Sequence, residues 1–164
     1  MEFEKALPRE AAEIFGMYRE AIGRMQAAGI DQWDDVYPTR AVVEQDIANG
    51  EMRVGLLDGA IVCAFVLNRE QWAGYENGDW QYPGLPFAVL HRLCIRSACQ
   101  GKGLGVQVMQ YVEALLKSEG VAVLQLDAFP QNQSAMKLYE KLGYIKVGDA
   151  PFRKGRFCLF EKKL

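Results

Sequence analysis

The clearest chemical signal in this sequence is a set of three glycines at alternate positions, Gly101, Gly103 and Gly105. They lie between an apolar run that ends near Ile95 and a helical pattern that follows. Glycine adopts positive φ easily and lets a ligand approach the backbone, so successive N–H groups can point at one anion. The following helix adds the positive end of its dipole. The pattern therefore predicts a turn that binds a phosphate or pyrophosphate.

The common nucleotide loops do not fit this spacing. A Walker loop needs Ser or Thr after its lysine, but Gly103 follows Lys102. A dinucleotide fingerprint would need glycine at position 106 or 108, and both positions hold valine. The spacing excludes a nucleotide-dependent kinase. A glycine-rich helix entry without a ligand is the remaining alternative, and three glycines together disfavour it.

The turn resembles the acetyl-CoA motif of the GNAT superfamily of N-acetyltransferases, [QR]-x-x-G-x-[GA], which residues 100–105 match at every fixed position. Residues 124–144 are similar to the family's next motif, with Asn132 and Tyr139 seven positions apart. The two motifs occur in the family's order, and the order of elements resembles the family fold along essentially the whole chain. The resemblance implies an N-acetyltransferase with acetyl-CoA as its co-substrate.

The resemblance also implies which residues contact the coenzyme. A splay between the fourth and fifth strands would admit the pantetheine arm, and Asn132 would contact it, although Asn132 is equally suited to cap a helix. The other implied contacts are the backbone of Leu93, Cys94 and Ile95 for the arm, and Gln100, Gly101, Lys102, Gly103, Leu104 and Gly105 for the pyrophosphate.

Most members of such a family transfer the acetyl group by direct attack of an amine, and Tyr139 lies where the family often places its general acid. A phenol with a pKa of about 10 can protonate a departing thiolate, which favours a catalytic role for Tyr139 over its alternative as a core aromatic. Backbone N–H groups near Cys94 and Ile95 are the expected oxyanion donors. For the base, His91, Asp127 and a chain of water molecules stay open.

Each candidate base has a structural alternative. His91 could be a hydrogen-bonded strand residue, and an Asp at a strand end such as Asp127 more often ties down a loop. Cys94 as a nucleophile is disfavoured, because His91 and Cys94, three positions apart, would face opposite sides of a regular strand.

The acceptor is expected to be a primary amine of a small molecule, a protein N-terminus or a lysine. Aromatic side chains in segments 32–37 and 72–80, with Asp34 and Asp35 nearby, suit a small cation, although aromatic residues in segment 32–37 could equally fill the core. The predicted acceptor contacts are Trp33, Tyr37 and Trp80. A non-catalytic module that senses acyl-CoA is the alternative function. A homodimer is kept open beside a monomer.

Composition places limits on these readings. With 164 residues, half of them hydrophobic, the chain is expected to form one domain over residues 1–164. A net charge of −2 argues against nucleic-acid binding, and apolar runs too short for a bilayer, with no signal-peptide pattern, favour the cytoplasm. Four cysteines without metal spacing and the single histidine predict reduced thiols and no metal.

The elements that would position these residues follow from periodicity and turn signals. Antiparallel strands come first and a β-α-β crossover follows, so an α/β fold of the GNAT-like type is expected. Its mixed, mostly antiparallel sheet has about seven strands with helices on both faces, splayed at strands 4 and 5. The expected strands are 3–7, 52–57, 60–68, 87–95, 121–126, 144–147 and 157–160, and the expected helices are 8–28, 39–48, 103–119 and 133–142.

Overall fold

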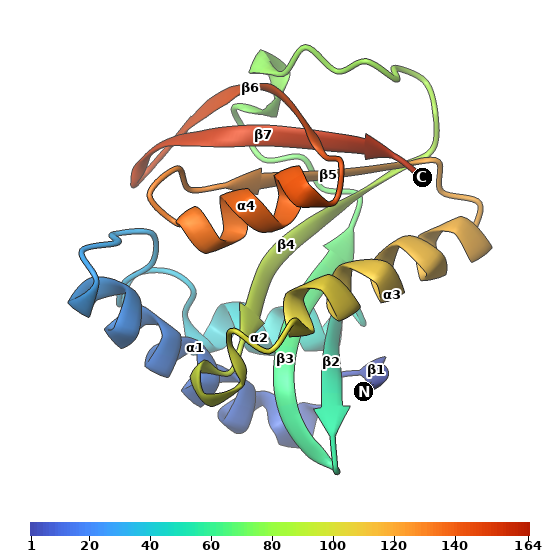
Figure 1. The fold of residues 1–164 in the computed structure, drawn as a ribbon. Coiled ribbons are helices and arrows are strands. Elements are labelled where there is room, and N and C mark those ends of the chain that lie inside the picture. The colour runs from blue at the N-terminus through green and yellow to red at the C-terminus, as the bar shows by residue number, and fades with distance from the viewer. The chain divides into compact units, whose positions relative to one another are not determined.

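The computed structural model describes residues 1–164 and shows a mixed α/β fold with seven strands and flanking helices (Figure 1). The strands are β1 (Glu2–Lys5), β2 (Met52–Leu57), β3 (Ala60–Asn68), β4 (Phe87–Ile95), β5 (Val123–Ala128), β6 (Ile145–Phe152) and β7 (Gly155–Lys163). The α-helices are α1 (Ala11–Ala27), α2 (Arg40–Ala48), α3 (Leu104–Ser118) and α4 (Gln133–Lys141).

The predicted fold class is confirmed. The strand order is β1-β2-β3-β4-β5-β7-β6, in which β4 and β5 are parallel. The pairs β1–β2, β2–β3, β5–β7 and β6–β7 are antiparallel. No helix of the chain is both long enough and apolar enough to cross a membrane.

The chain forms two compact units, each built from two separate segments. The first unit comprises residues 1–67 and 91–104, and the second comprises residues 68–90 and 105–164. Strand β4 therefore contributes its first half to the second unit and its second half to the first. The expectation of a single domain over 1–164 stays a prediction.

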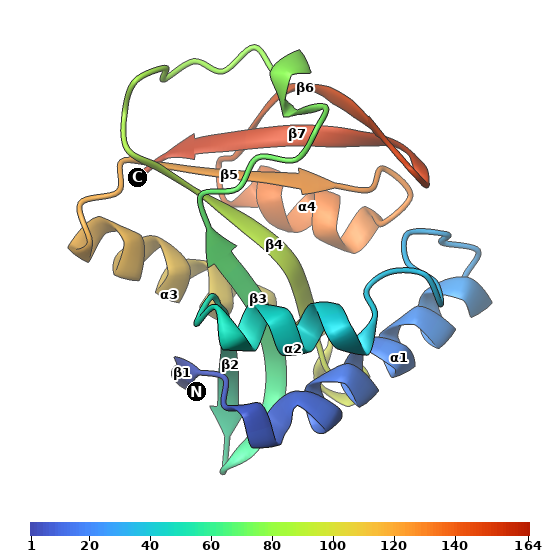
Figure 2. The ribbon, with the colours of Figure 1, turned by 180° about the vertical axis from the view of Figure 1, so that it is seen from behind.

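In the first unit, α1 and α2 lie on the same face of β2 and β3 (Figure 2). Their apolar stripes form one core with the strands, including Ile14, Tyr18 and Val43, all fully buried. Thr39 caps α2 as predicted, because its hydroxyl accepts a hydrogen bond from the N–H of Val42. The hairpin predicted between β2 and β3 is also present.

In the second unit, β5 pairs with β4 on one side and with β7 on the other. The parallel ladder joins residues 87–90 to residues 123–126. The splay expected between these two strands stays a prediction. Alternation along β7 sends Leu159 and Phe160 to opposite faces. Loop 69–86 packs through Tyr75 on the face of Leu159, whereas Tyr139 of α4 packs on Phe160.

Candidate active site

The glycine turn has the backbone that the sequence predicted. Gly101 and Gly103 have φ values of +75° and +78°, in the left-handed region that favours glycine. A Cβ atom added at either residue would meet no other atom within 4 Å, so the space beside both backbones is open. Helix α3 begins at Leu104, directly after this turn. Open space next to left-handed backbone at a helix start fits an anionic group such as a pyrophosphate.

Two side chains hold the start of this turn in place. Gln100 donates from Nε2 to the carbonyl of Ile95 at 3.0 Å, and its own N–H donates to the carbonyl of Ser97. Arg96 donates from Nε to the carbonyl of Ile61 at 2.7 Å, and its backbone N–H bonds to Val62. Gln100 thus fixes the start of the loop, and its own N–H is already bonded within it.

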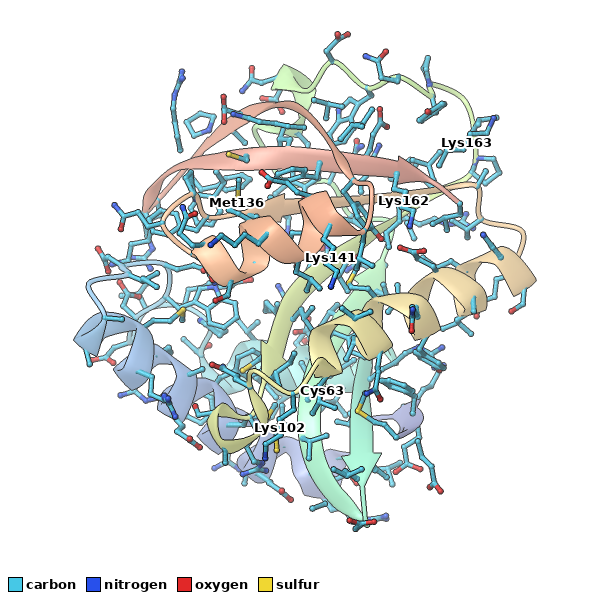
Figure 3. All side chains as sticks on the ribbon, viewed as in Figure 1. Cys63, Lys102, Met136, Lys141, Lys162 and Lys163 are labelled. Carbon is cyan, nitrogen blue, oxygen red and sulfur yellow. The ribbon has the colours of Figure 1, made fainter.

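Lys102 is the one charged side chain within residues 100–105, and it is exposed on the turn (Figure 3). Leu104 is 8% exposed and anchors the start of α3. Gly105 lies within the first turn of that helix. The turn thus combines an apolar anchor with an exposed backbone and one exposed cation.

The end of β4 carries the three residues predicted to pair with the pantetheine arm. Leu93 and Ile95 are half-buried, and Cys94 is buried. Burial, with further effects from Cys63 and Glu20, raises the pKa of Cys94 to about 12, so its side chain is a neutral thiol near neutral pH. Cys94 therefore fills the core of the first unit. All four cysteines are free thiols, as predicted.

Strand β4 is irregular at Arg92, and this changes one argument made from the sequence. Arg92 has a φ of +52°, which breaks the alternation of side chains between His91 and Cys94. The strand spacing therefore no longer separates these two residues onto opposite faces. The raised pKa of Cys94 now provides the argument against a nucleophilic role, because the thiolate and not the neutral thiol is the nucleophile.

The side chain of Arg92 lies in a buried polar cluster of the first unit. Its guanidinium donates to both carboxylate oxygens of Asp46, at 3.0 and 2.7 Å, and from a third nitrogen to the hydroxyl of Tyr37 at 2.6 Å. The Arg92 and Asp46 side chains are 7% and 9% exposed. The hydroxyl of Tyr18 donates to the carbonyl of Arg92 at 2.6 Å.

Segment 32–37, predicted to contact the acceptor, forms a tight turn next to this cluster. The Asp34 carboxylate accepts hydrogen bonds from the N–H groups of Val36 and Tyr37. Trp33 is 8% exposed and its ring meets Tyr18 edge-on at 5.5 Å. Trp33 thus packs in the core, whereas Tyr37 is half-buried and Val36 is exposed.

In the second unit, Tyr139 is buried at 6% exposure among aromatic rings. Its ring lies 5.8 Å from that of Tyr144 and 6.2 Å from that of Phe160. Burial, followed by the charge of Asp127, raises the pKa of Tyr139 above its ordinary value. The phenol therefore keeps its proton throughout the working pH range, as a general acid must before it donates.

Asp127 is engaged with loop 69–86. Its Oδ1 accepts a hydrogen bond of 2.8 Å from Tyr75, which is 1% exposed. Trp80 stacks on Tyr75 at 5.7 Å between ring centroids and donates from Nε1 to the Tyr75 carbonyl. The loop is thus a folded part of the second unit, in which Trp80 has a packing role, and its predicted contact with the acceptor stays a prediction.

Two further predicted residues have clear placements. His91 is 3% exposed and begins the part of β4 that belongs to the first unit. Asn132 caps α4, because its side-chain oxygen accepts from the N–H of Ala135 at 3.2 Å. Its contact with the coenzyme stays a prediction beside that structural role.

The structure thus brings the predicted residues together in two sets. The first unit contains Trp33, Tyr37 and residues 91–104, which include the end of β4 and most of the glycine turn. Gly105, Asp127, Asn132, Tyr139 and Trp80 belong to the second unit.

Sequence reasoning missed Arg92, Asp46 and Tyr18. A signal was present for the first two, because each places a charge inside an apolar pattern. Asp46 follows Val43 by three positions on the stripe of α2, and Arg92 interrupts the apolar strand 87–95. A charge on a buried face indicates that a partner is needed, but the pattern does not show which residue provides it.

Comparison with known proteins gives consistent matches. The sequence profile of the acetyltransferase (GNAT) family matches residues 20–144. A Pseudomonas paraeruginosa L-methionine sulfoximine/L-methionine sulfone acetyltransferase is 27% identical over 141 residues, covering 84% of this chain and 76% of that protein.

Solved structures agree with this result. A GNAT-family acetyltransferase from Streptococcus agalactiae superposes with a TM-score of 0.87 at 25% identity, over 99% of this chain and 95% of that one. A Salmonella typhimurium protein described as an acetyltransferase, solved with its cofactor acetyl-CoA, has the same fold. Its TM-score is 0.71 at 16% identity, over 99% and 93% of the two chains.

Proposed function

This chain belongs to the GNAT family of acetyltransferases and takes acetyl-CoA as its co-substrate, and on that premise we propose that it acetylates a primary amine by direct attack. The observation that carries the proposal is the left-handed backbone at Gly101 and Gly103, open to solvent at the start of α3. Both glycines lie in the segment, residues 100–105, that resembles the acetyl-CoA motif of the family.

In this proposal the N–H groups from Gly101 to Gly105 bind the pyrophosphate of the coenzyme, and Gln100 holds the loop that presents them. Lys102 also attracts the phosphates, but only weakly, because solvent and salt screen the charge of an exposed side chain. The backbone of residues 93–95 pairs with the pantetheine arm as an added strand would, and Asn132 contacts the same arm. These assignments follow the family motifs residue by residue.

The chemical step requires four groups. The lone pair of the neutral amine attacks the thioester carbon, and backbone N–H groups near Cys94 and Ile95 stabilise the charge on its oxygen. The C–S bond then breaks, and the thiolate takes the proton of Tyr139. The nitrogen gives up its extra proton to a base, and Tyr139 regains a proton from solvent. The products are an acetylated amine and the free thiol of CoA.

Three candidates for the base remain. His91 is a candidate because the imidazole of an unperturbed histidine, with a pKa near 6.5, can take a proton from an ammonium. Asp127 carries a charge, but its Oδ1 accepts the Tyr75 hydrogen bond, which supports an anchoring role. A chain of water molecules is the third candidate, and pH profiles of variants distinguish them.

We propose a small amino-acid amine as the first acceptor class to test. The Pseudomonas relatives are named for transfer to methionine sulfoximine and methionine sulfone. Segment 32–37 of this chain carries Asp34 beside the half-buried Tyr37, a combination that suits a small ammonium, whereas Asp35 is paired with Arg19. A protein N-terminus and a lysine side chain are the competing acceptors.

The test is an acceptor screen in which the free CoA thiol is monitored. Methionine sulfoximine, methionine sulfone, free amino acids, polyamines and peptides with a free N-terminus or lysine are each offered with acetyl-CoA. Acceptor-dependent thiol release, with an N-acetylated product by mass spectrometry, supports the enzyme. Tight binding of acetyl-CoA without release on any acceptor would favour the alternative, a module that senses acyl-CoA.

Two secondary proposals accompany this function. Four free cysteines suit a reducing compartment, which supports the cytoplasm as the location. A homodimer stays a proposal, and light scattering at several protein concentrations distinguishes it from a monomer.

A further inference from the structure

Arg92 joins two parts of the first unit that the proposed function uses separately. One part is the end of β4, residues 93–95, whose backbone is proposed to hold the pantetheine arm. The other is segment 32–37, which ends in Tyr37 and is proposed to contact the acceptor. Arg92 precedes the first part directly in the chain and touches the second through its guanidinium.

The backbone of Arg92 is held in an unfavourable conformation. A φ of +52° is strained in a residue with a Cβ, and such strain persists only where neighbours enforce it. The hydroxyl of Tyr18, itself fully buried, donates to the Arg92 carbonyl at 2.6 Å. This contact fixes the direction in which the chain enters residues 93–95.

The side chain of Arg92 is held just as firmly. Two of its nitrogens donate to the two oxygens of Asp46 in a bidentate pair, and both side chains are largely buried. Burial alone would lower the pKa of Arg92, but Tyr37 and Asp46 raise it overall, so the charge is kept. A buried ion pair adds little net stability compared with an apolar pair, so its geometry is its main contribution.

The remaining nitrogen of the guanidinium is directed at Tyr37. It donates to the phenol oxygen at 2.6 Å, and the guanidinium carbon lies 5.8 Å from the centre of the Tyr37 ring. Because its two bonds to Asp46 orient the guanidinium, the third nitrogen offers the Tyr37 hydroxyl a hydrogen-bond donor in a fixed direction.

We propose that Arg92 is a positioning residue for the acceptor. Its hydrogen bond to Tyr37 holds the Tyr37 ring in a fixed position relative to the backbone of residues 93–95. The proposal rests on the proposed function, since it assigns segment 32–37 to the acceptor. Arg92 touches neither acceptor nor coenzyme and acts through Tyr37. Loss of the bond between Arg92 and Tyr37 weakens acceptor binding and leaves coenzyme binding intact.

A double-mutant cycle tests this. Tyr37→Phe keeps the ring and removes the hydroxyl, and Arg92→Lys keeps the charge and removes the planar fork. Each single variant is expected to raise the acceptor KM at least fivefold. The acetyl-CoA Kd should stay within twofold in Tyr37→Phe. The double variant should raise KM no further than the larger single effect, because both changes break one connection. Arg40→Lys, on the exposed pair between Arg40 and Glu44, is the matched control and should change neither constant.

The outcomes separate the proposals. If the wild-type protein transfers acetyl groups but the two single effects multiply in full, or the acceptor KM is unchanged, the positioning role is wrong and the proposed function stands. If KM and the acetyl-CoA Kd rise together in Tyr37→Phe, its role is only structural. If the wild-type protein acetylates no amine, the proposed function and this inference fail together. Where Arg92→Lys does not fold, a Tyr37→Phe variant with an unchanged acceptor KM by itself overturns the inference.

Discussion

Tyr75 and Asp127, 52 positions apart in the chain, are joined by a hydrogen bond of 2.8 Å from the phenol to Oδ1 of the carboxylate. The bond attaches loop 69–86 to strand β5 within the second unit. An aspartate at the end of a strand was expected to tie down the loop after it, and this one holds the loop before β4. The carboxylate therefore has a structural task, whatever part it takes in catalysis.

Substitution of Asp127 separates the two roles. Asp127→Asn keeps an oxygen that can accept from Tyr75, whereas Asp127→Ala removes the acceptor from a buried hydroxyl and should cost about 1–3 kcal/mol of unfolding free energy. If Asp127 is an anchor, the Asn variant should keep both its stability and its kcat within a few-fold. Chemical denaturation and steady-state kinetics are the measurements. A loss of kcat of a hundredfold or more in the stable Asn variant would identify Asp127 as the base.

Gly103→Val tests the phosphate-binding turn. Valine at a φ of +78° is strained, and its side chain would occupy the open space beside the N–H groups. The affinity for CoA by calorimetry should fall at least tenfold, about 1.4 kcal/mol.

Gly120→Val is the matched control for that variant. Gly120 has a φ of +76° and equally open surroundings, but it follows α3 at the far end of that helix from the turn. It should suffer the same strain and keep its CoA affinity. An equal loss of affinity in both variants would contradict the assignment of the turn. Lys117→Ala, an exposed site on α3, serves as a control for lost charge, whereas Arg96 is unsuitable because it bonds to β3.

His91→Gln tests the base by its pH dependence. If His91 takes the proton of the acceptor, kcat/KM of the wild-type protein should rise with pH as the imidazole becomes neutral, and this limb should be absent in His91→Gln. Initial rates from pH 5 to pH 9 at saturating acetyl-CoA measure it. A limb that persists unchanged in the variant would transfer the role to Asp127 or to water.

Tyr139→Phe tests the general acid. The ring is kept, so its packing on Tyr144 and Phe160 should survive and Tm should change little. The thiolate would leave without its proton donor, which typically costs about 10²–10⁴-fold in rate. We expect kcat to fall at least tenfold while the CoA affinity stays within a few-fold. A variant with full kcat on the best acceptor would show that Tyr139 is a core residue only.

Cys63 predicts how stability depends on high pH. Burial raises the pKa of this thiol from about 9 to about 12. A raised pKa means that the folded protein keeps a proton that the unfolded chain loses. The stabilisation is therefore fully present below pH 9 and is lost as the pH rises towards 12. Denaturation midpoints at pH 8 and pH 10.5 should differ, and the difference should be smaller in Cys63→Ala. An identical difference in both proteins would contradict the raised pKa.

Features that depend on local backbone could be predicted from the sequence. Asp58 and Gly59 both adopt positive φ in the expected hairpin, and Thr39 caps α2 as expected. The backbone of Gly101 and Gly103 belongs to the same class, because a glycine turn next to a helix has few other solutions.

Strands β6 and β7 show where local signals fail. Residues 148–151 contain glycine, aspartate and proline, which are typical of a turn, so the sixth strand was expected to end at Val147. In the structure β6 continues to Phe152 through an irregularity between Lys146 and Gly148, because it pairs with β7 along its length. As the outer strand of the sheet, β6 can include a proline.

The contacts of Arg92 could not be predicted, because they depend on which distant elements meet. Asp46, Tyr37 and Tyr18 are 46, 55 and 74 positions away in the chain. A pattern of residues within a short stretch of sequence does not show which distant residues come into contact. Trp33 and Tyr37 show the same limit, since the sequence left both open between core and site.

The buried pair of Asp46 and Arg92 also constrains how the chain can change over generations. Replacing either residue alone leaves the other as an uncompensated buried charge, at a cost of about 3–5 kcal/mol. A lineage that drifts from this pair to two apolar residues must pass through a form that has lost much of a typical domain's stability. The two positions should therefore change together or stay fixed together among descendants of this chain, as a covarying couple 46 residues apart.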